Sequence, residues 1–167
     1  MTQKDIPNCF LPVTQLTEKL EKGLLSSLEL IEEYLERIRK YDRNLGAFID
    51  VYEDDSRKAA SASDMARASG HIIGPLQGIP VAVKDIIDIE GKITTGGSMV
   101  WKDRRSTLTA TLVRRMVEAG MIVLGKTHTV EFAMGSFGTN QHMGSPKNPW
   151  DLEAVSYTHL RAHETHL

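Results

Sequence analysis

The residue with the clearest chemical potential is a lysine at the end of a short apolar run. Residues 74–85 read GPLQGIPVAVKD, and the run IPVAV has the composition of a strand covered on both faces. Burial disfavours the ammonium form of lysine and lowers its pKa, which would make Lys84 a proton acceptor at neutral pH. The ordinary alternative is a strand-end lysine that reaches water or pairs with Asp85 or Asp88. Composition alone favours this alternative.

A second stretch of interest, residues 125–136, reads GKTHTVEFAMGS. We expect it to leave the end of a predicted strand, where α/β sheets place their ligands, and its small residues allow close approach to the backbone. A ligand-binding loop and an incidental connector both remain open. Residues 125–127 resemble the end of a phosphate loop, but the earlier glycine of that pattern would be Gly120, with the strand in between. The order is wrong, so we reject a nucleotide site.

The helices and strands that must position these two stretches can be predicted from the spacing of apolar residues and from the residues that typically begin or end such elements. Ser26 and Glu29 form a capping-box pattern, and an apolar stripe of helical spacing over residues 28–38 predicts a helix. Further helices are predicted over residues 15–21, 54–68 and 109–119, and strands over residues 46–52, 79–83 and 121–124. Strand–helix–strand order predicts parallel pairing through a right-handed crossover, so the expected class is α/β.

Composition narrows the functional classes. A formal charge of -2 with 25% charged residues does not indicate the excess of basic residues that is typical of proteins with a nucleic-acid partner. Cys9 is the single cysteine, which excludes an internal disulfide and a cysteine metal cluster. No run approaches the ~20 apolar residues of a membrane span, and the N-terminus lacks the apolar core of a signal peptide. We therefore expect a cytoplasmic protein with no membrane partner.

Several separate motifs, in order and in register, resemble those of the amidase signature family. The resemblance runs from Leu11 to Glu153 and is carried by residues 74–85, 94–98, 110–113, 119–120, 125–127, 131–136 and 148–151. It implies the N-terminal portion of the amidase-signature fold, a mixed sheet flanked by helices, which would be incomplete in this chain. It also implies a small-molecule amide as substrate, with no cofactor and no metal.

The resemblance further implies a Ser–cisSer–Lys triad that hydrolyses or transfers carboxamides. Lys84 corresponds to the family's lysine, which takes a proton from a bridging serine that in turn activates the nucleophilic serine. That bridging serine sits on a cis peptide bond, which costs ~3 kcal/mol away from proline. Met134, Gly135 and Ser136 correspond to the segment that lines the substrate pocket. For Thr95 and Ser98 we expect a supporting polar role, with local turn hydrogen bonds as the alternative.

The chain departs from the family pattern after Glu153. A glycine/serine-rich segment should supply the bridging serine, but residues 154–167 read AVSYTHLRAHETHL. We expect residues 1–153 to be a partial amidase-signature domain and residues 154–167 to be a non-family tail, because this tail resembles a translated sequencing adapter or vector end. A zinc site on His159, His163 and His166 is the weaker alternative, since the spacing falls one residue short of the zinc-protease pattern. Without either serine, the fragment is predicted to be inactive.

Two further alternatives concern partners and activity. The parent could be the A subunit of a glutamyl-tRNA amidotransferase, which would act with amidotransferase partner subunits. The pair Thr129-Val130, where that protein would have something nearer Met-Asp, favours a free-standing amidase, for which a homodimer is the other assembly considered. The other alternative is a non-catalytic binding module that retains the pocket loop.

Overall fold

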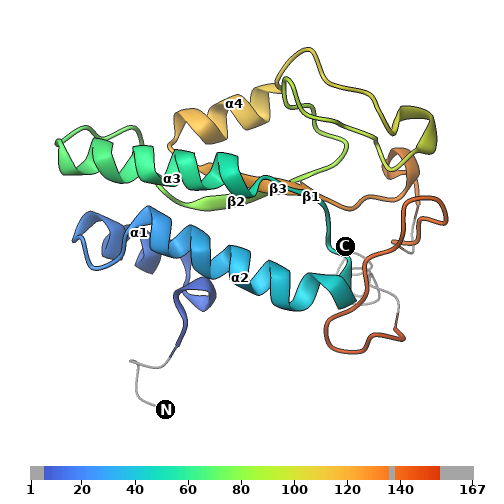
Figure 1. Cartoon of the computed structure of the whole chain (residues 1–167), viewed down its shortest axis with the longest axis horizontal. Coiled ribbons are helices and arrows are strands. Elements are labelled where there is room, and N and C mark those ends of the chain that lie inside the picture. The colour runs from blue at the N-terminus through green and yellow to red at the C-terminus, as the bar shows by residue number, and fades with distance from the viewer. Residues whose placement is uncertain (1–5, 136–137, 155–167) are drawn as a thin grey trace, which may run out of the picture. The chain divides into compact units, whose positions relative to one another are not determined.

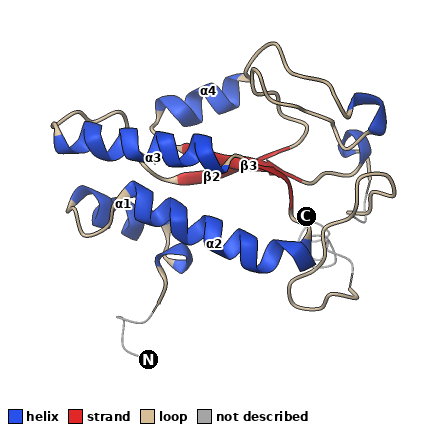
Figure 2. Cartoon of the chain, viewed as in Figure 1, coloured by secondary structure: helices blue, strands red, loops and turns tan. Residues whose placement is uncertain are grey.

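A computed structural model describes residues 6–135 and 138–154 of this chain. The chain divides into two compact units. Unit 1 comprises the chain up to Arg39, Val51–Ala82 and Thr111–Gly125, and unit 2 comprises Lys40–Asp50, Val83–Ala110 and the chain from Lys126 on. Figure 1 shows that the labelled helices belong mainly to the segments of unit 1. In Figure 2, loops make up most of the segments of unit 2.

The first two helices begin where the sequence predicts a start. Helix α1 spans Val13–Glu21 and α2 spans Ser27–Leu45. The backbone N–H of Ser26 donates to Oε2 of Glu29 (2.8 Å), and the N–H of Glu29 donates to Oγ of Ser26 (3.1 Å). This reciprocal pair is the predicted capping box, which satisfies two of the N–H groups that a helix start leaves without partners.

Helix α3 spans Glu53–Ala68 and α4 spans Thr111–Glu118. Helices α2 and α3 lie side by side in Figure 1. Asp64 of α3 accepts hydrogen bonds from the N–H groups of Ser27 (2.7 Å) and Leu28 (3.0 Å), so its carboxylate adds a second cap at the start of α2.

Three strands form the sheet, and each contributes residues to both units. They are β1 (Phe48–Val51), β2 (Pro80–Lys84) and β3 (Ile122–Thr127), in the order β1-β3-β2. All seven predicted helices and strands are therefore present, with most bounds shifted by a few residues and with α2 extending seven residues past its predicted end. Parallel pairing across the β2–α4–β3 unit is also confirmed, because the N–H of Gly78 bonds Gly120 O and the N–H of Asp85 bonds Thr127 O, so the register advances along both strands together.

Strand β1 makes the sheet mixed. The N–H of Tyr52 donates to Leu124 O (2.8 Å), and the N–H of His128 donates to Ala47 O (2.9 Å). The register therefore runs in opposite directions along β1 and β3, which is the antiparallel arrangement. A mixed α/β sheet flanked by helices is the fold class that the resemblance implied.

Two sequence-based expectations about the strands were wrong. The stretch from residue 125 was expected to leave the strand end, but β3 continues through Thr127, because Thr127 still pairs with Asp85. Strand β2 was expected to be covered on both faces, yet Ala82 is exposed. Among the described strands β2 pairs only with β3, which explains how one of its positions reaches solvent.

The core of unit 1 consists of two apolar clusters. One gathers residues of α1 and α2 around Ile79, and the other gathers residues of α2, α3 and β3. The buried members are Leu16, Leu20, Leu25, Leu30 and Ile79 in the first, and Ile31, Leu35, Ala60, Ile122 and Leu124 in the second. Among the described helices, none combines the length and the apolar character that crossing a membrane requires.

Candidate active site

Lys84, the predicted base, is the last residue of β2 and is half-buried. Within residues 6–135 and 138–154, no side chain or backbone group forms a hydrogen bond or ion pair with its Nζ atom. The two carboxylates that the sequence offered as partners are committed elsewhere: Asp85 pairs with Lys126, and Asp88 pairs with Arg104. The structure therefore leaves the Lys84 amine without either acidic neighbour.

Asp85 is almost fully buried and ties the end of β2 to two other segments. Its backbone N–H donates to Thr127 O of β3 (3.0 Å), and its carbonyl accepts from the N–H of Gly96 (2.9 Å). Its carboxylate accepts from both the N–H and the hydroxyl of Thr95. A buried carboxylate needs such donors to replace water, and here they come from the loop that follows Lys84.

Lys126 is the positively charged partner of the Asp85 carboxylate. Its side chain has no exposed surface, and Nζ lies 3.5 Å from Oδ1 of Asp85. Nζ also donates to the carbonyl of Ile87 (2.7 Å) and to Oγ1 of Thr94 (2.8 Å). Burial lowers the pKa of Lys126 below its ordinary value, and the nearby carboxylates of Asp85 and Asp88 oppose that shift.

Sequence reasoning missed Lys126, because it considered this lysine only as part of a rejected phosphate loop. A signal was present. Ile122 and Leu124 are buried, and side chains alternate along a strand, so residue 126 falls on the same face as these two apolar residues. Extending the predicted strand by three residues would have marked Lys126 as a buried cation in need of a carboxylate.

A second ion pair lies beside the first. Arg104 donates to Oδ1 of Asp88 (2.6 Å), and the Ser106 hydroxyl lies 2.7 Å from the same oxygen. The Ser106 hydroxyl is also 3.0 Å from Oγ1 of Thr94, which joins this pair to Lys126. Burial would raise the pKa of Asp88, but the hydrogen bonds from Ser106 and Arg104 outweigh it and hold that pKa below its ordinary value.

The loop Thr94–Ser98 connects these pairs to the second predicted stretch. The carbonyl of Gly96 accepts from the N–H of Phe132 (2.6 Å), and the Ser98 hydroxyl donates to Oε1 of Glu131 (2.7 Å). The Thr95 hydroxyl donates to Asp85. Thr95 and Ser98 thus both bond to groups of other segments and hold the loop in place.

A pocket of about 270 Å³ opens against this second stretch. It is lined by Val130, Glu131, Met134, Gly135, Thr139, Asn140, Gln141 and His142. Met134 and Gly135, two of the three predicted substrate contacts, are therefore in its wall, whereas Ser136 lies outside the described residues. Lys84 does not line this pocket. The structure thus brings two of the predicted site residues together and places the predicted base apart from them.

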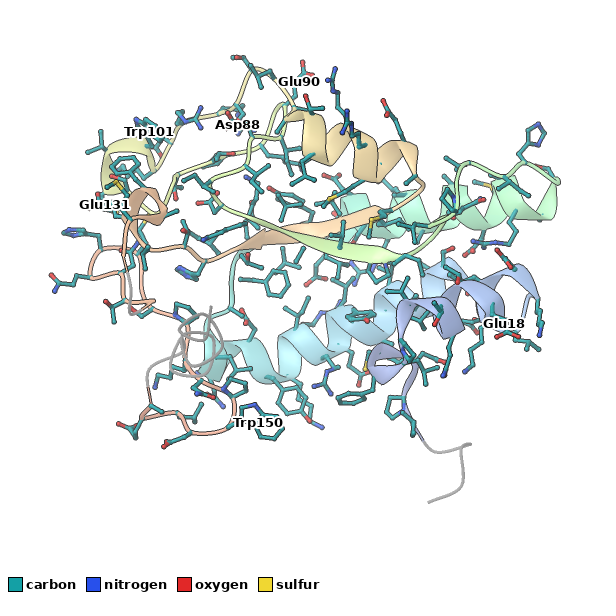
Figure 3. All side chains as sticks on the ribbon, turned by 180° about the vertical axis from the view of Figure 1, so that it is seen from behind. Glu18, Asp88, Glu90, Trp101, Glu131 and Trp150 are labelled. Carbon is teal, nitrogen blue, oxygen red and sulfur yellow. The ribbon has the colours of Figure 1, made fainter. Side chains whose placement is uncertain are left out.

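The wall of the pocket has an unusual backbone. Phe132 and Ala133 both adopt left-handed conformations, with φ of 50° and 57°. The ring of Phe132 meets that of Trp101 edge-on, with the centroids 5.0 Å apart. Figure 3 shows Trp101 and Glu131 close together. Strained backbone of this kind concentrates at functional sites, where the surrounding contacts enforce it.

Asn140 fixes the other side of the pocket wall. Its Nδ2 donates to the carbonyls of Gly97 (2.6 Å) and Thr129 (3.1 Å), and its Oδ1 accepts from the N–H of His142 (3.0 Å). Gly97 has φ of 71°, and a Cβ at that position would lie 2.6 Å from Thr129 O. Only glycine fits this approach, so the loop and the pocket segment meet through backbone atoms.

His128, which follows β3, makes the stability of unit 2 dependent on pH. Its Nδ1 is buried and has no hydrogen-bond partner among the described residues. Burial lowers the pKa of His128 below 6.5, and the carboxylates of Asp42 and Asp85 only partly oppose it. The unfolded chain therefore binds a proton more readily than the folded one, and stability should be full above pH 6.5 and fall as the pH drops through and below that value.

The variant His128→Leu should flatten this dependence, since it removes the group that titrates. The measurement is urea unfolding at about pH 7.5 and about pH 5, compared between the unsubstituted chain and the variant. His71→Leu serves as the control, because His71 is exposed. An equal loss of stability at acid pH in the unsubstituted chain and in His128→Leu would contradict the assignment.

Among the described residues, no cluster of three or more His, Cys, Asp or Glu side chains is arranged to hold a metal ion. The histidines of the alternative zinc site, His159, His163 and His166, lie outside the described residues. Cys9, the single cysteine, is half-buried, and burial together with Glu33 raises the pKa of its thiol.

Comparison with known proteins identifies the group to which this site belongs. The family model described as Amidase matches residues 29–156, which is more than half of the chain. The chain belongs to the amidase family. This agrees with the motifs that carried the resemblance and with the mixed sheet of the fold.

Individual members of the amidase family match most of this chain. The glutamyl-tRNA(Gln) amidotransferase A subunit of Halorhodospira halophila is 41% identical over 143 residues, covering 86% of this chain and 29% of that protein. Its counterpart of the same name from Aromatoleum aromaticum is 44% identical, also with 86% and 29% covered. The solved structure of the peptide amidase from Stenotrophomonas maltophilia superposes with a TM-score of 0.80 at 34% identity, covering 87% of this chain and 31% of that one.

The chain thus spans about 30% of the length of these amidase relatives. The matched portion includes Lys84, the Thr94–Ser98 loop and the pocket segment up to Gly135, because the family match covers residues 29–156.

Proposed function

We propose that this chain is the part of an amide hydrolase that supplies the proton acceptor and one wall of the substrate pocket. The observation that carries the proposal is the position of Lys84. It is the last residue of β2, is half-buried, and has no ionic partner among the described residues, while Asp85 and Asp88 are paired with other cations. Because neither acidic neighbour bonds to its amine, the Nζ atom of Lys84 is available to a serine hydroxyl.

In the proposed reaction, Nζ of neutral Lys84 accepts a proton from a bridging serine, which takes the proton of a nucleophilic serine. The nucleophile attacks the amide carbonyl, and the leaving amine departs with a proton returned through the same relay. Water then hydrolyses the acyl-enzyme. Both serines are expected in the part of the relatives that this chain does not match, so residues 1–153 would supply only Lys84 to the triad.

Met134, Gly135 and Ser136 are proposed as substrate contacts. The pocket of about 270 Å³ that Met134 and Gly135 help to line supports this assignment for those two residues. Its lining mixes apolar side chains with a carboxylate and amide groups, which suits a small molecule that carries a carboxamide.

Transfer of ammonia to a partner protein is the second candidate function. The favouring observation is that relatives 41% and 44% identical to this chain carry the name of the glutamyl-tRNA(Gln) amidotransferase A subunit. Co-purification with the other subunits of such an enzyme would support it, whereas hydrolysis of simple amides without any partner would favour a free-standing amidase.

The 167-residue chain alone is expected to show no amide hydrolysis, because Lys84 has no serine relay to serve. The measurement is ammonia release from simple aliphatic and aromatic amides, with binding of the same amides followed by NMR. Binding without turnover fits the loss of the relay and also the alternative of a binding module. Turnover that Lys84→Ala abolishes would contradict the expected inactivity.

A further inference from the structure

The buried pair of Lys126 and Asp85 connects the end of β3, the turn after Lys84 and the Thr94–Ser98 loop. Asp85 directly follows Lys84, and its carboxylate accepts from Thr95 as well as from Lys126. Nζ of Lys126 reaches the turn after Lys84 through Ile87 O (2.7 Å) and the next loop through Oγ1 of Thr94 (2.8 Å). All three donor positions of the ammonium group thus have acceptors within reach.

The contacts continue from the loop to the pocket. Gly96 donates to the carbonyl of Asp85 and accepts from Phe132, and the Ser98 hydroxyl donates to Glu131. Glu131 lines the pocket, and the ring of Phe132 packs against Trp101. An unbroken set of hydrogen bonds therefore leads from Lys126 to the pocket wall.

Stability alone does not account for this ion pair. Removing two charges from water costs several kcal/mol per ion, and well-packed apolar residues of similar volume often stabilise a protein as well or better. The side chains of Lys126 and Asp85 are 0% and 1% exposed, so the full desolvation applies to both. A charged pair differs from an apolar pair because its hydrogen bonds are directional. Those hydrogen bonds determine which backbone groups lie next to one another.

We propose that Lys126 and Asp85 are positioning residues, which set the turn after Lys84 and the Thr94–Ser98 loop so that the loop holds the pocket wall in place. This inference rests on the proposed function for the importance of Lys84 and the pocket. Lys84 is the last residue of β2 and Asp85 directly follows it, and their side chains form no ion pair, so the pair acts on Lys84 through the backbone rather than by contact.

Trp101 provides the readout. The sequence has two tryptophans, and Trp150 is 90% exposed, so Trp150→Phe leaves Trp101 as the single tryptophan. In that background, Asp85→Asn with Lys126→Met removes both charges while an oxygen at position 85 still accepts from Thr95. We expect acrylamide to quench Trp101 about twice as strongly, and the amide hydrogens of Gly96 and Phe132 to exchange about tenfold faster or more.

The matched control breaks an ion pair of unit 1. Glu32→Gln with Arg57→Met removes a 2.6 Å pair together with the contacts of Arg57 to Glu53 and Asp54, and we expect no change in Trp101 quenching or in the exchange of Phe132. An effect of the same size in this control would show a general loss of stability and overturn the proposal.

A second variant covers the case in which the double variant does not fold. Thr94→Val removes the 2.8 Å contact between the loop and Lys126 but keeps the pair with Asp85. It should raise Trp101 quenching and Phe132 exchange in the same direction. Unchanged quenching and exchange in either folded variant overturns the proposal. Neither the quenching nor the exchange measurement depends on amide turnover. The proposed function can therefore fail while this inference holds, and this inference can fail while the proposed function holds.

Discussion

Lys84→Ala should lower kcat/KM for amide hydrolysis by a factor on the order of 10² to 10⁴, the usual contribution of a general base. The measurement uses residues 1–153 joined to the remaining part of the Stenotrophomonas maltophilia peptide amidase, and the unsubstituted chimera is the reference. The loss is expected because Lys84 is the group proposed to receive the proton of the serine relay, and no neighbouring residue is proposed to replace it.

Two further variants separate a base from a fixed positive charge. Lys84→Arg keeps the charge, but a guanidinium does not deprotonate in proteins, so this variant should lose as much activity as Lys84→Ala. Lys58→Ala, at an exposed position of α3, should keep the activity of the reference. Activity retained by Lys84→Arg would contradict a proton-accepting role.

Lys126→Met should lower the free energy of unfolding by about 3–5 kcal/mol, the usual cost of leaving a buried charge without its partner. The variant keeps the length of the side chain but removes the ammonium group, so Asp85, at 1% exposure, loses its counter-charge in a site that water does not reach. Urea unfolding at pH 7 measures the change. Adding Asp85→Asn should recover most of it, because the second substitution removes the unpaired carboxylate.

The control for this cycle is Lys22→Met. Lys22 pairs with Glu18 in an ion pair whose side chains are 59% and 60% exposed, and water screens such pairs. Its unfolding midpoint should match that of the unsubstituted chain. A loss in Lys126→Met that Asp85→Asn does not reduce would mean that packing, rather than charge, holds this site.

The elements with local signals could be predicted from the sequence. The capping box of Ser26 and Glu29 lies within four residues and depends on no distant contact, so the start of α2 was predicted within one residue. The parallel pairing of β2 and β3 followed from the strand–helix–strand order of the chain rather than from particular contacts. Local punctuation by glycine and proline located the short strands, although β3 extends three residues past its predicted end.

The site depended on contacts that no local pattern encodes. Lys126 and Asp85 are 41 residues apart, and each taken alone looks like a charged residue at the end of a strand. From the sequence, Asp85 was considered as a partner of the nearest lysine, Lys84, whereas in the structure it forms an ion pair with Lys126. The Asp85 carboxylate is buried against Thr95 and Lys126, which is the physical reason why it does not pair with the lysine next to it in the sequence. The membership of Met134 and Gly135 in a pocket came from the family resemblance and not from spacing.

The two left-handed residues in the pocket wall have an energetic consequence. A left-handed conformation costs an ordinary residue about 1–2 kcal/mol, so Phe132 and Ala133 together carry about 2–4 kcal/mol. The edge contact with Trp101 contributes about 0.5–1.5 kcal/mol, and the hydrogen bond from Phe132 to Gly96 contributes a similar amount. These contacts offset much of that cost, so the left-handed pair is kept by its neighbours rather than by its own backbone preference. The shape of this part of the pocket wall therefore depends on residues far away in the sequence, Gly96 and Trp101, and not on the segment alone.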